Sequence, residues 1–520
     1  MDLRDSAARV MGLAQDDRVD EALALAEEAL STPGDAPPGE LAGVWYAVAV
    51  AEHVRGATDR QVVASARCLE LGLAAQQPGW VSNALSMRAM AQIRHGAVEP
   101  ALADLARAEV ALSDCTDDGL RNWAHTGLGY CYLELRLYEL ALPHFEAAVD
   151  IVACPLPLPA ARTIDLMNLA ELHLRWADEL ERARPTSGVE AEVEQHRAQG
   201  HQHAQAAVAE AERLGPRGML ATCRATELCA RPRNEAASTV AELRAAYANP
   251  GHVEHHGGRA TLAAALARTL WRVGQFEEAL GTARTAVEHS RTAGDWQVAA
   301  SAQWLLVEME AEAGIPGAAA GRDYGRLLSE VLWNQRLSTL AGAKATLETE
   351  RLRHAKDAAQ RAALEDPLTG VGNRRALEDA LRQARLEDVT EEHPTSLLLL
   401  DLGAFKSIND RHGHTVGDTV LRSAASAIRQ AARAEDTVAR LGGDEFVVLA
   451  RGTDEEAGTR LAERVAEAVN GLEVMLPDGP LRLGASVGVR TTGRDLTLDD
   501  LLDAADAAMY DVKRGVHARG

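Results

Sequence analysis

The chain has 520 residues, of which 47% are hydrophobic and only 4% aromatic, and its formal net charge is −23. This composition is typical of an Ala- and Leu-rich helical protein and excludes an intrinsically disordered one. The negative charge argues against a nucleic-acid-binding protein and against binding to anionic membranes. No apolar run approaches the about 20 residues of a transmembrane helix, and the start of the chain lacks the pattern of a signal peptide. We therefore expect a cytoplasmic protein with no membrane or nucleic-acid partner.

All six cysteines precede residue 230, and none of them has C-x-x-C spacing. Scattered cysteines of this kind are typical of small buried apolar residues rather than of a metal site or a disulfide framework. Two groups of histidines could hold a metal, but their polar, Gly-containing surroundings favour solvated loops or helix ends. They are His196, His201 and His203, and His252, His255 and His256.

Residues 1–325 show a helical pattern that is interrupted by short Gly, Pro or Asp turns. Small and large residues recur at the same offsets in two stretches of this region, Leu128, Gly129, Tyr132, Ala141, Phe145 and Ala148, and Leu266, Ala267, Leu270, Ala279, Ala283 and Ala286. These offsets resemble the tetratricopeptide (TPR) pattern, with repeats of about 34 residues. The resemblance implies an all-α superhelical solenoid whose concave groove binds a peptide or a partner protein. An ordinary helical bundle is the alternative.

Residues 326–365 connect this region to the rest of the chain. Because no Gly or Pro falls between Ala343 and Glu365, the pattern predicts one long helix. An apolar seam formed by Leu337, Leu340 and Leu347 indicates a short coiled coil with a partner chain, although a solvated spacer helix is the alternative.

Residues 366–520 contain two short runs suited to strands, 437–440 and 447–450, on either side of Gly442-Gly443-Asp444-Glu445. Glycines between such runs predict a β-hairpin, since glycine adopts the positive φ of a tight turn. Adjacent carboxylates raise each other's cost of ionisation unless a cation neutralises them, and hard divalent cations prefer carboxylate oxygens. The tip of this hairpin is therefore a candidate Mg²⁺ site.

Further motifs surround the hairpin. The segment 366–375 reads DPLTGVGNRR, a buried strand of four leucines delivers Asp401, and the segment 405–418 reads FKSINDRHGHTVGD. The helix 454–470 and a single alternating strand over 481–489 come after the hairpin, and a last helix opens with Thr497. Together these motifs resemble the GGDEF domain of the diguanylate cyclases. The resemblance implies an α+β domain with the ferredoxin-like palm of nucleotidyl cyclases.

The resemblance also implies an activity, the condensation of two GTP molecules into cyclic di-GMP and two pyrophosphates. It implies a homodimer, because each domain holds one GTP, and two Mg²⁺ (or Mn²⁺) ions per active site. The residues to which it assigns roles are Asp401, Leu402 (through its carbonyl), Asp444 and Glu445 for metal and catalysis; Asn409 and Asp418 for guanine; Ala404, Phe405, Lys406 and Lys513 for phosphate; and Arg433 and Asp436 for an inhibitory site that binds the product.

The sequence departs from the family pattern at two places. Gly403 stands where the family has a second acid, and His517 stands where it has an arginine. These departures leave open a degenerate domain that binds GTP or cyclic di-GMP as a receptor. A pure scaffold that works only through its repeats is the remaining alternative.

Overall fold

A computed structural model describes most of the chain. The chain is divided into two compact units, Met1–Leu352 and Arg353–Gly520. The description covers all residues except 1, 16–17, 32–34, 152–159, 184–188, 216–218, 233–235, 249–257, 294, 388–393, 477–478, 493–497 and 518–520. The second histidine group and Cys154 therefore lie outside the described residues.

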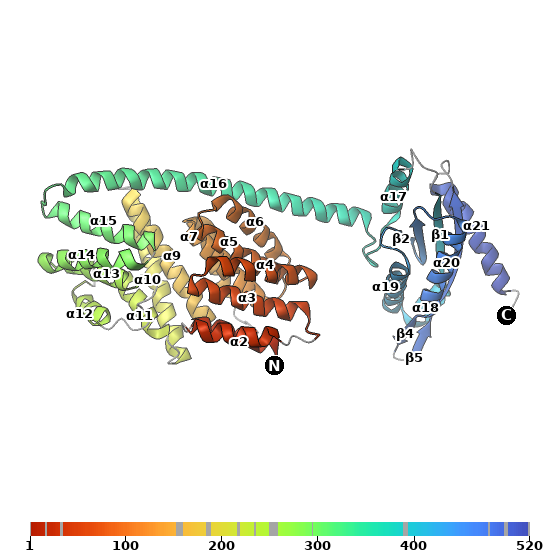
Figure 1. The fold of residues 1–520 in the computed structure, drawn as a ribbon, viewed down its shortest axis with the longest axis horizontal. Helices are drawn as coiled ribbons and strands as arrows, with labels where there is room; N and C mark the ends of the chain where they lie inside the picture. Colours follow the sequence, from red (N-terminus) through yellow and green to blue (C-terminus); the bar gives the residue numbers. More distant parts are fainter. Residues whose placement is uncertain are drawn as a thin grey trace. The chain divides into compact units, whose positions relative to one another are not determined.

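The first unit is built from helices joined by short turns (Figure 1). Consecutive helices pack in pairs, α1 with α2, α3 with α4, α5 with α6, α7 with α8, α9 with α10, and α13 with α14. The helices are α1 (Leu3–Gln15), α2 (Val19–Ser31), α3 (Pro38–Arg55), α4 (Thr58–Ala74), α5 (Pro78–Arg94), α6 (Val98–Ser113), α7 (Asp118–Glu134), α8 (Tyr138–Asp150), α9 (Ala161–Ala183), α10 (Val189–Leu214), α11 (Met219–Ala230), α12 (Ala236–Ala248), α13 (Gly258–Arg272), α14 (Phe276–Ala293) and α15 (Trp296–Glu312).

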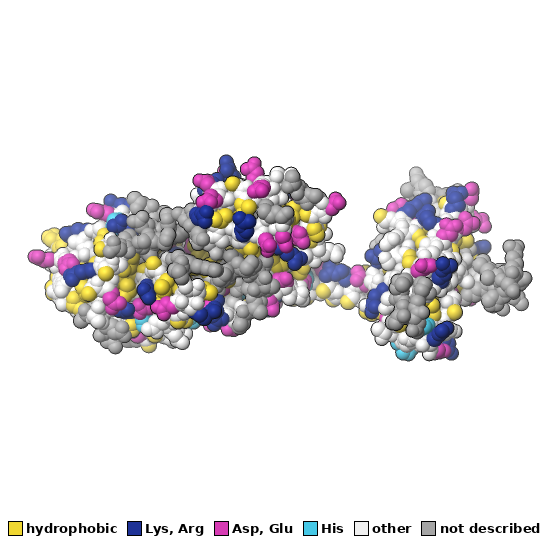
Figure 2. Space-filling view, turned by 90° about the horizontal axis from the view of Figure 1, so that it is seen from below, with side chains coloured by type: hydrophobic (Ala, Val, Ile, Leu, Met, Phe, Trp, Pro, Cys, Tyr) yellow, Lys and Arg dark blue, Asp and Glu magenta, His cyan; other side chains and the backbone are white. Residues whose placement is uncertain are grey.

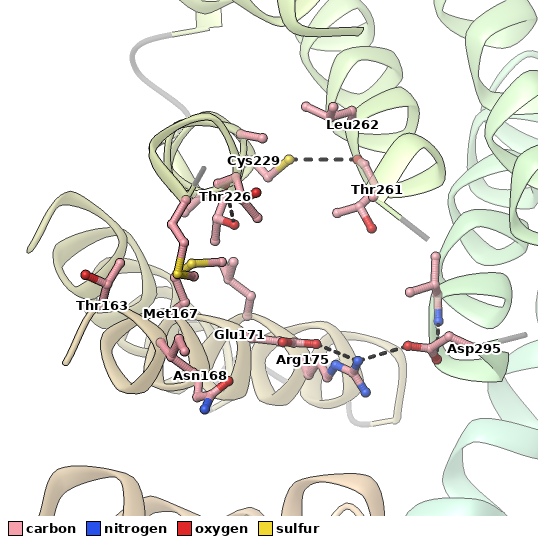
Figure 3. Close-up of a pocket in the computed structure, with 18 of the residues that line it drawn as sticks. Thr163, Met167, Asn168, Glu171, Arg175, Thr226, Cys229, Thr261, Leu262 and Asp295 are labelled. Carbon is pink, nitrogen blue, oxygen red and sulfur yellow. Dashed lines mark hydrogen bonds and ion pairs between the residues drawn. The ribbon is translucent and has the colours of Figure 1, made fainter. Parts of the chain in front are cut away.

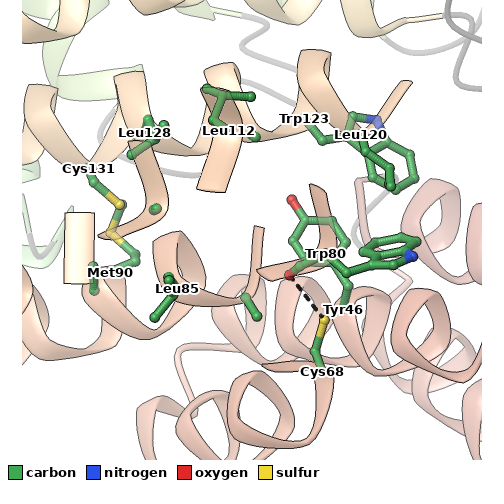
Figure 4. Close-up of a cluster of buried hydrophobic side chains, with 14 of the residues drawn as sticks. Tyr46, Cys68, Trp80, Leu85, Met90, Leu112, Leu120, Trp123, Leu128 and Cys131 are labelled. Atoms are coloured by element: carbon green, nitrogen blue, oxygen red, sulfur yellow. Dashed lines mark hydrogen bonds between the residues drawn. The ribbon is translucent and has the colours of Figure 1, made fainter. Parts of the chain in front are cut away.

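Small residues allow the paired helices to approach each other. A Cβ atom on Gly129 of α7 would lie 2.7 Å from the ring of Phe145 of α8, so only glycine fits at this crossing. Between successive pairs, aromatic side chains fill the core, and Tyr46 stacks on Trp123 with a ring separation of 5.5 Å (Figure 4). The small-residue offsets in the sequence thus mark helix contacts.

The described cysteines behave as the sequence predicts. Cys68, Cys115, Cys131 and Cys223 are free and buried, and Cys229 is half-buried. The first histidine group differs from the expectation of loops or helix ends, since all three residues lie within α10. There His196 is buried and shares a hydrogen bond of 2.9 Å with His173 of α9. The polar residues around His196 in the sequence did not indicate that this face of α10 is buried.

A single long helix, α16 (Ala318–Leu364), follows these pairs. The absence of Gly and Pro predicted its part after Ala343, and the helix also extends back across Gly342, Gly325 and Gly321. One of its faces packs on the first unit. Arg336 has a side chain only 1% exposed, forms an ion pair of 2.7 Å with Glu139, and donates to the Arg136 carbonyl at 3.0 Å. Leu340 and Leu347 are buried, whereas Leu337 is 40% exposed. Two of the three residues of the seam expected to meet a partner chain therefore pack within this chain.

The second unit contains a four-stranded antiparallel sheet in the order β2-β3-β1-β6. The elements alternate as strand, helices, two strands, helix and strand, which is the ferredoxin-like order predicted from the sequence. They are α17 (Arg374–Glu387), β1 (Thr395–Gly403), α18 (Phe405–His412), α19 (His414–Ala431), β2 (Thr437–Gly442), β3 (Glu445–Ala450), α20 (Glu455–Asn470), β4 (Glu473–Leu476), β5 (Gly479–Arg482), β6 (Gly484–Thr492) and α21 (Leu498–His517).

The expected single strand over 481–489 is instead divided. β5 pairs with β4 in a separate ribbon, and β6 pairs with β1 in the main sheet. The apolar alternation continues across the break at Leu483, so periodicity alone does not reveal it. Thr497, expected to open the last helix, lies outside the described residues.

Acidic and basic side chains are interspersed on the face of the molecule shown in Figure 2, where neither sign forms one continuous patch. None of the described helices combines the length and the apolarity that crossing a bilayer requires.

Candidate functional site

The register of the central strands brings the predicted acids together. Asp401 near the end of β1 is paired directly with Glu445, the first residue of β3. Residues opposite each other in an antiparallel pair have Cβ atoms about 4.5–5.5 Å apart. The Leu402 amide donates to the Asp444 carbonyl at 3.3 Å, which places Asp444 beside the same strand end.

The hairpin tip depends on two glycines with positive φ, Gly442 at 154° and Gly443 at 55°. The guanidinium of Arg440 donates to the Gly443 carbonyl through Nε at 3.0 Å and Nη2 at 2.7 Å. These two hydrogen bonds fix the turn from which Asp444 and Glu445 project.

Arg440 is held in turn by Asp366, in the segment before α17. Its Nη1 donates to both carboxylate oxygens, at 3.1 and 3.3 Å, and the amide and hydroxyl of Thr369 donate to one of those oxygens. Partial burial of Asp366 opposes ionisation, but the hydrogen bonds from Thr369 and Arg440 prevail and lower its pKa. The sequence alone indicates no role for Asp366, Thr369 or Arg440, although the motif Asp-Pro-Leu-Thr at 366–369 contains the first two of them.

The same segment ties the end of α16 to the hairpin. The Asn373 amide donates to the Leu364 carbonyl at 2.8 Å, and the Gly372 amide donates to the Val438 carbonyl at 2.9 Å. The Arg440 amide then donates to the Gly372 carbonyl at 2.7 Å. The last turn of the long helix and β2 are therefore linked through a few backbone hydrogen bonds.

The predicted phosphate-binding residues begin α18. Ala404 caps this helix in the left-handed conformation, with φ 60°, and Phe405 is its first helical residue. The free amides of a helix N-terminus form an anion site. Lys406 lies in the first turn and is exposed, so its ammonium group can reach an anion there. The side chain of Lys513 in α21 lies outside the described residues.

Asn409, one of the two predicted guanine-binding residues, lies against Gly417, the neighbour in sequence of the other, Asp418. A Cβ on Gly417 would lie 1.9 Å from Oδ1 of Asn409, which means that the Asn409 amide of α18 rests directly on α19. Asp418 follows Gly417 and is half-buried. An amide and a carboxylate so placed can accept and donate hydrogen bonds on the edge of a purine.

Arg433 and Asp436 lie in the turn between α19 and β2. The Arg433 amide donates to Oδ2 of Asp436 at 2.8 Å, while the Oδ1 atom is buried without a hydrogen-bond partner. Burial raises the pKa of Asp436. The Arg433 side chain is exposed, so this pair is held together by its backbone and leaves the guanidinium available.

The donors at the strand ends suit Mg²⁺ in part. Within the described residues no three His, Cys, Asp or Glu side chains are grouped as a complete metal site. Mg²⁺ usually takes only one or two carboxylates from the protein and completes its shell with substrate phosphates and water. The oxygen atoms at the strand ends are of the type that Mg²⁺ prefers: the carboxylates of Asp401, Asp444 and Glu445 and the carbonyl of Leu402.

The first unit contains a separate cavity of about 2060 Å³, lined mainly by α1, α9, α11, α13 and α15 (Figure 3). On its wall, Arg175 of α9 forms ion pairs with Glu171 at 2.5 Å and Asp295 at 2.9 Å, and it hydrogen-bonds Gln297 at 3.0 Å. The contacts with Asp295 and Gln297 connect α9 to the start of α15, 120 residues or more further along the chain.

Comparison with known proteins identifies the second unit. Residues 363–519 match the family model described as diguanylate cyclase, GGDEF domain. The chain is 38% identical over 152 residues to the bifunctional diguanylate cyclase/cyclic di-GMP phosphodiesterase MucR of Pseudomonas aeruginosa, which is 29% of this chain and 22% of that protein. It is 32% identical over 150 residues to diguanylate cyclase DgcZ of Escherichia coli, which is 29% of this chain and 50% of that protein.

Among solved structures, the coiled coil and GGDEF domain of DgcB from Caulobacter crescentus in complex with c-di-GMP is 30% identical, with a TM-score of 0.32, and covers 33% of this chain and 92% of that one. The chain spans between 22% and 50% of the length of these two curated relatives and of three others. The match of residues 363–519 to the family model identifies this part of the second unit as a GGDEF domain.

Proposed function

We propose that this protein is a diguanylate cyclase that condenses two GTP molecules into cyclic di-GMP and releases two pyrophosphates. The observation that carries the proposal is the direct pairing of Asp401 with Glu445 across two antiparallel strands, with Asp444 beside them. Phosphoryl transfer requires mainly positioning and charge neutralisation, which a fixed group of carboxylates beside an anion site supplies.

The other site residues bind and orient the substrate. Asn409 and Asp418 hold guanine, while Lys406, Lys513 and the amides at Ala404 and Phe405 hold phosphate oxygens. Asp401, Glu445, Asp444 and the Leu402 carbonyl would hold the metal ions. Two Mg²⁺ or Mn²⁺ ions per site, when bound, would supply Lewis-acid chemistry that lowers the pKa of the ribose hydroxyl and neutralises charge on the leaving pyrophosphate. Because each domain holds one GTP, two domains from two chains must face each other.

Purified protein with GTP and Mg²⁺ tests the proposal when cyclic di-GMP formation is followed by chromatography. The variant Glu445→Gln removes one carboxylate charge at constant shape and is expected to abolish product formation. Glu467→Gln, an exposed acid in α20, is the matched control and should retain the rate of the unchanged protein. Product no greater in the unchanged protein than in Glu445→Gln would reject the enzyme.

A second function is favoured by Gly403, which replaces an acid of the family pattern. A domain that binds GTP or cyclic di-GMP without turnover would act as a receptor. Equilibrium dialysis with either nucleotide, in a protein that makes no product, would identify this function.

The Arg433–Asp436 turn is proposed as the inhibitory site for cyclic di-GMP. The exposed guanidinium of Arg433 is suited to a phosphate oxygen of an anionic ligand, because charge-assisted hydrogen bonds from arginine to phosphate are strong. Arg433→Ala is expected to weaken product inhibition at least tenfold and leave the initial rate unchanged. Equal inhibition of both proteins would remove this assignment.

The first unit is proposed to be a TPR-like solenoid that binds a protein or peptide partner in its cavity and controls the cyclase. The lining by the first helices of several pairs supports this proposal, since stacked helix pairs present such helices on a concave face. Full-length protein should differ from residues 360–520 in rate and in dimerisation. Equal values for both would count against control by this unit.

A further inference from the structure

Three arginines form a cluster in the wall of the cavity of the first unit. Arg182 of α9, Arg197 of α10 and Arg268 of α13 line the cavity and make up this arginine cluster. They share the carboxylate of Asp178, whose Oδ1 atom lies 3.7 Å from Nη2 of Arg197 and 3.7 Å from Nη1 of Arg268. Asp178 also precedes Arg182 by one turn of α9, so the two lie on the same face of the helix. Burial opposes ionisation of Asp178, but the three guanidinium groups prevail and lower its pKa.

The next arginine of the same wall has more acidic partners than the cluster. Arg175 forms ion pairs with both Glu171 and Asp295 (Figure 3). In the cluster, by contrast, Arg197 has a second acid, the exposed Glu181 at 2.5 Å, and the other two arginines have no second one among the acids that the structure describes. The cluster thus has fewer acids than arginines, and an additional anion would balance its charge.

Hydrogen-bond donors at the cluster also lack acceptors. A guanidinium group carries five N–H donors. Within the described part of the chain, the Arg182 side chain donates only to Ser301, at 2.6 Å, and Nη1 of Arg197 is buried without a hydrogen-bond partner. Gln297, one turn before Ser301 on α15, accepts from Arg175 at 3.0 Å, while its own Nε2 atom is buried without a partner. Since an unpaired buried donor is costly, these atoms favour a ligand that brings acceptors.

We propose that the cavity binds a peptide segment and that a carboxylate group of this peptide enters the arginine cluster. The proposal rests on the proposed function in one respect, the assignment of the partner to this cavity. Planar guanidinium groups bind carboxylates through paired hydrogen bonds. A peptide also supplies carbonyl groups, and the unpaired Nε2 atom of Gln297 is a donor for one of them.

The size and the lining of the cavity select this class of ligand. Its volume of about 2060 Å³ exceeds the about 300–1000 Å³ that small-molecule pockets usually have. One turn before Arg268, Ala264 and Ala265 line the cavity with small apolar side chains, which leave room for apolar groups of a peptide. Among the described lining residues, eight are acidic and eight are arginines. A ligand with many negative charges would meet these acids and be repelled, so one carboxylate on a mostly uncharged peptide fits best.

Binding of synthetic peptide pools to the full chain tests the class of ligand. Each pool contains random hexapeptides of Ala, Leu, Ser and Thr with an acetylated N-terminus. One pool ends in a free carboxylate, a second ends in an amide and carries one central Glu, and a third ends in an amide and is uncharged. After equilibrium dialysis without GTP, mass spectrometry measures how much of each pool the protein retains.

At least one of the two carboxylate pools should be retained tenfold or more above the uncharged pool. Which one it is shows whether the carboxylate is a chain end or a side chain. If neither carboxylate pool exceeds the uncharged pool, the proposal is overturned. A fourth pool, amidated and with one central phosphoserine, addresses the other common anion, and retention above both carboxylate pools would reject the carboxylate.

Arg182→Gln tests the cluster itself. The variant removes one positive charge, so retention of the carboxylate pool should fall at least tenfold while retention of the uncharged pool stays the same. Arg268→Gln should behave likewise, and circular dichroism verifies that each variant is folded. Arg94→Gln is the matched control, because Arg94 lines the same cavity and its side chain donates to the His53 carbonyl at 3.1 Å. An equal loss for both pools, or the same loss in the control, would show that the cluster does not recognise the carboxylate.

Failure of this proposal and failure of the proposed function are distinguishable, because the binding assay contains no GTP. If the peptides bind as expected but change neither the rate of product formation nor dimerisation, the binding site is supported and control by the first unit is wrong. If full-length protein and residues 360–520 differ in rate but no carboxylate pool is retained, control is supported and this binding site is wrong.

Discussion

Replacement of Gly417 by alanine separates substrate binding from stability. The added Cβ would lie 1.9 Å from Oδ1 and 3.0 Å from Cγ of Asn409, so the amide must move by more than 1 Å from the position proposed to hold guanine. Loss of one or two hydrogen bonds costs about 1–3 kcal/mol, which weakens GTP binding roughly 5- to 150-fold. Alanine in place of glycine within α19 meanwhile stabilises the helix by up to about 1 kcal/mol.

The expected signature is therefore a higher KM for GTP together with an unchanged or slightly higher melting temperature. Initial rates of pyrophosphate release over a range of GTP concentrations measure KM, and calorimetry measures the melting temperature. Gly281→Ala in α14 is the matched control, because a Cβ there meets nothing within 4 Å, and it should leave KM unchanged. A Gly417→Ala protein with the KM of the unchanged protein would refute the placement of Asn409 on guanine.

The remaining predictions concern the hairpin, the missing acid and two histidines of the first unit, the half-buried His125 and the buried His173. Arg440→Ala removes the hydrogen bonds to Gly443 and Asp366. It should lower the free energy of unfolding, measured with denaturant, by about 2–4 kcal/mol and the rate of product formation at least tenfold. A variant as stable and active as the unchanged protein would show that the hairpin tip keeps its conformation without Arg440. Gly403→Asp should fold normally and keep or raise the rate, since a Cβ there comes no closer than 3.4 Å to the Gly484 carbonyl; a tenfold loss of rate would mean that the glycine is required. Burial lowers the pKa of His125 to about 4 and of His173 to about 3, so both stay neutral in the fold while the unfolded chain takes up protons below about pH 6.5. The stability of the first unit should be complete above that pH and fall on acidification towards pH 4, by about 1–2 kcal/mol per histidine at pH 5 after allowance for solvent screening; equal melting temperatures at pH 7.5 and pH 5 would contradict this.

Local patterns in the sequence predicted the main sheet of the second unit well. Four consecutive leucines before Asp401 indicated a buried strand, and two glycines with two acids indicated a hairpin, so the pairing of Asp401 with Glu445 followed from two short segments. The break between β5 and β6 could not be predicted in this way, because a change of pairing partner leaves the alternation of side chains intact.

Contacts between distant segments were harder to predict. Asp366 and Arg440 are 74 residues apart, and neither residue alone suggests the other. Leu340 and Leu347 have the spacing of a coiled coil, but the same spacing serves a helix that packs on its own chain. Only burial separates the two cases, and burial is a property of the folded chain.

The short backbone path from Leu364 through Gly372 to Arg440 has a mechanical consequence. A rotation of the last turn of α16 would move Gly372 and Arg440, because backbone hydrogen bonds join these segments directly. Arg440 in turn donates to the Gly443 carbonyl, so the rotation would reach the glycine turn. Rotation of the long helix would therefore change the direction in which the Glu445 side chain projects from the turn. It would also change the distance between the GGDEF domains of two chains. Regulation of such a protein would then act on the geometry of the site in each GGDEF domain, in addition to how often two such domains face each other.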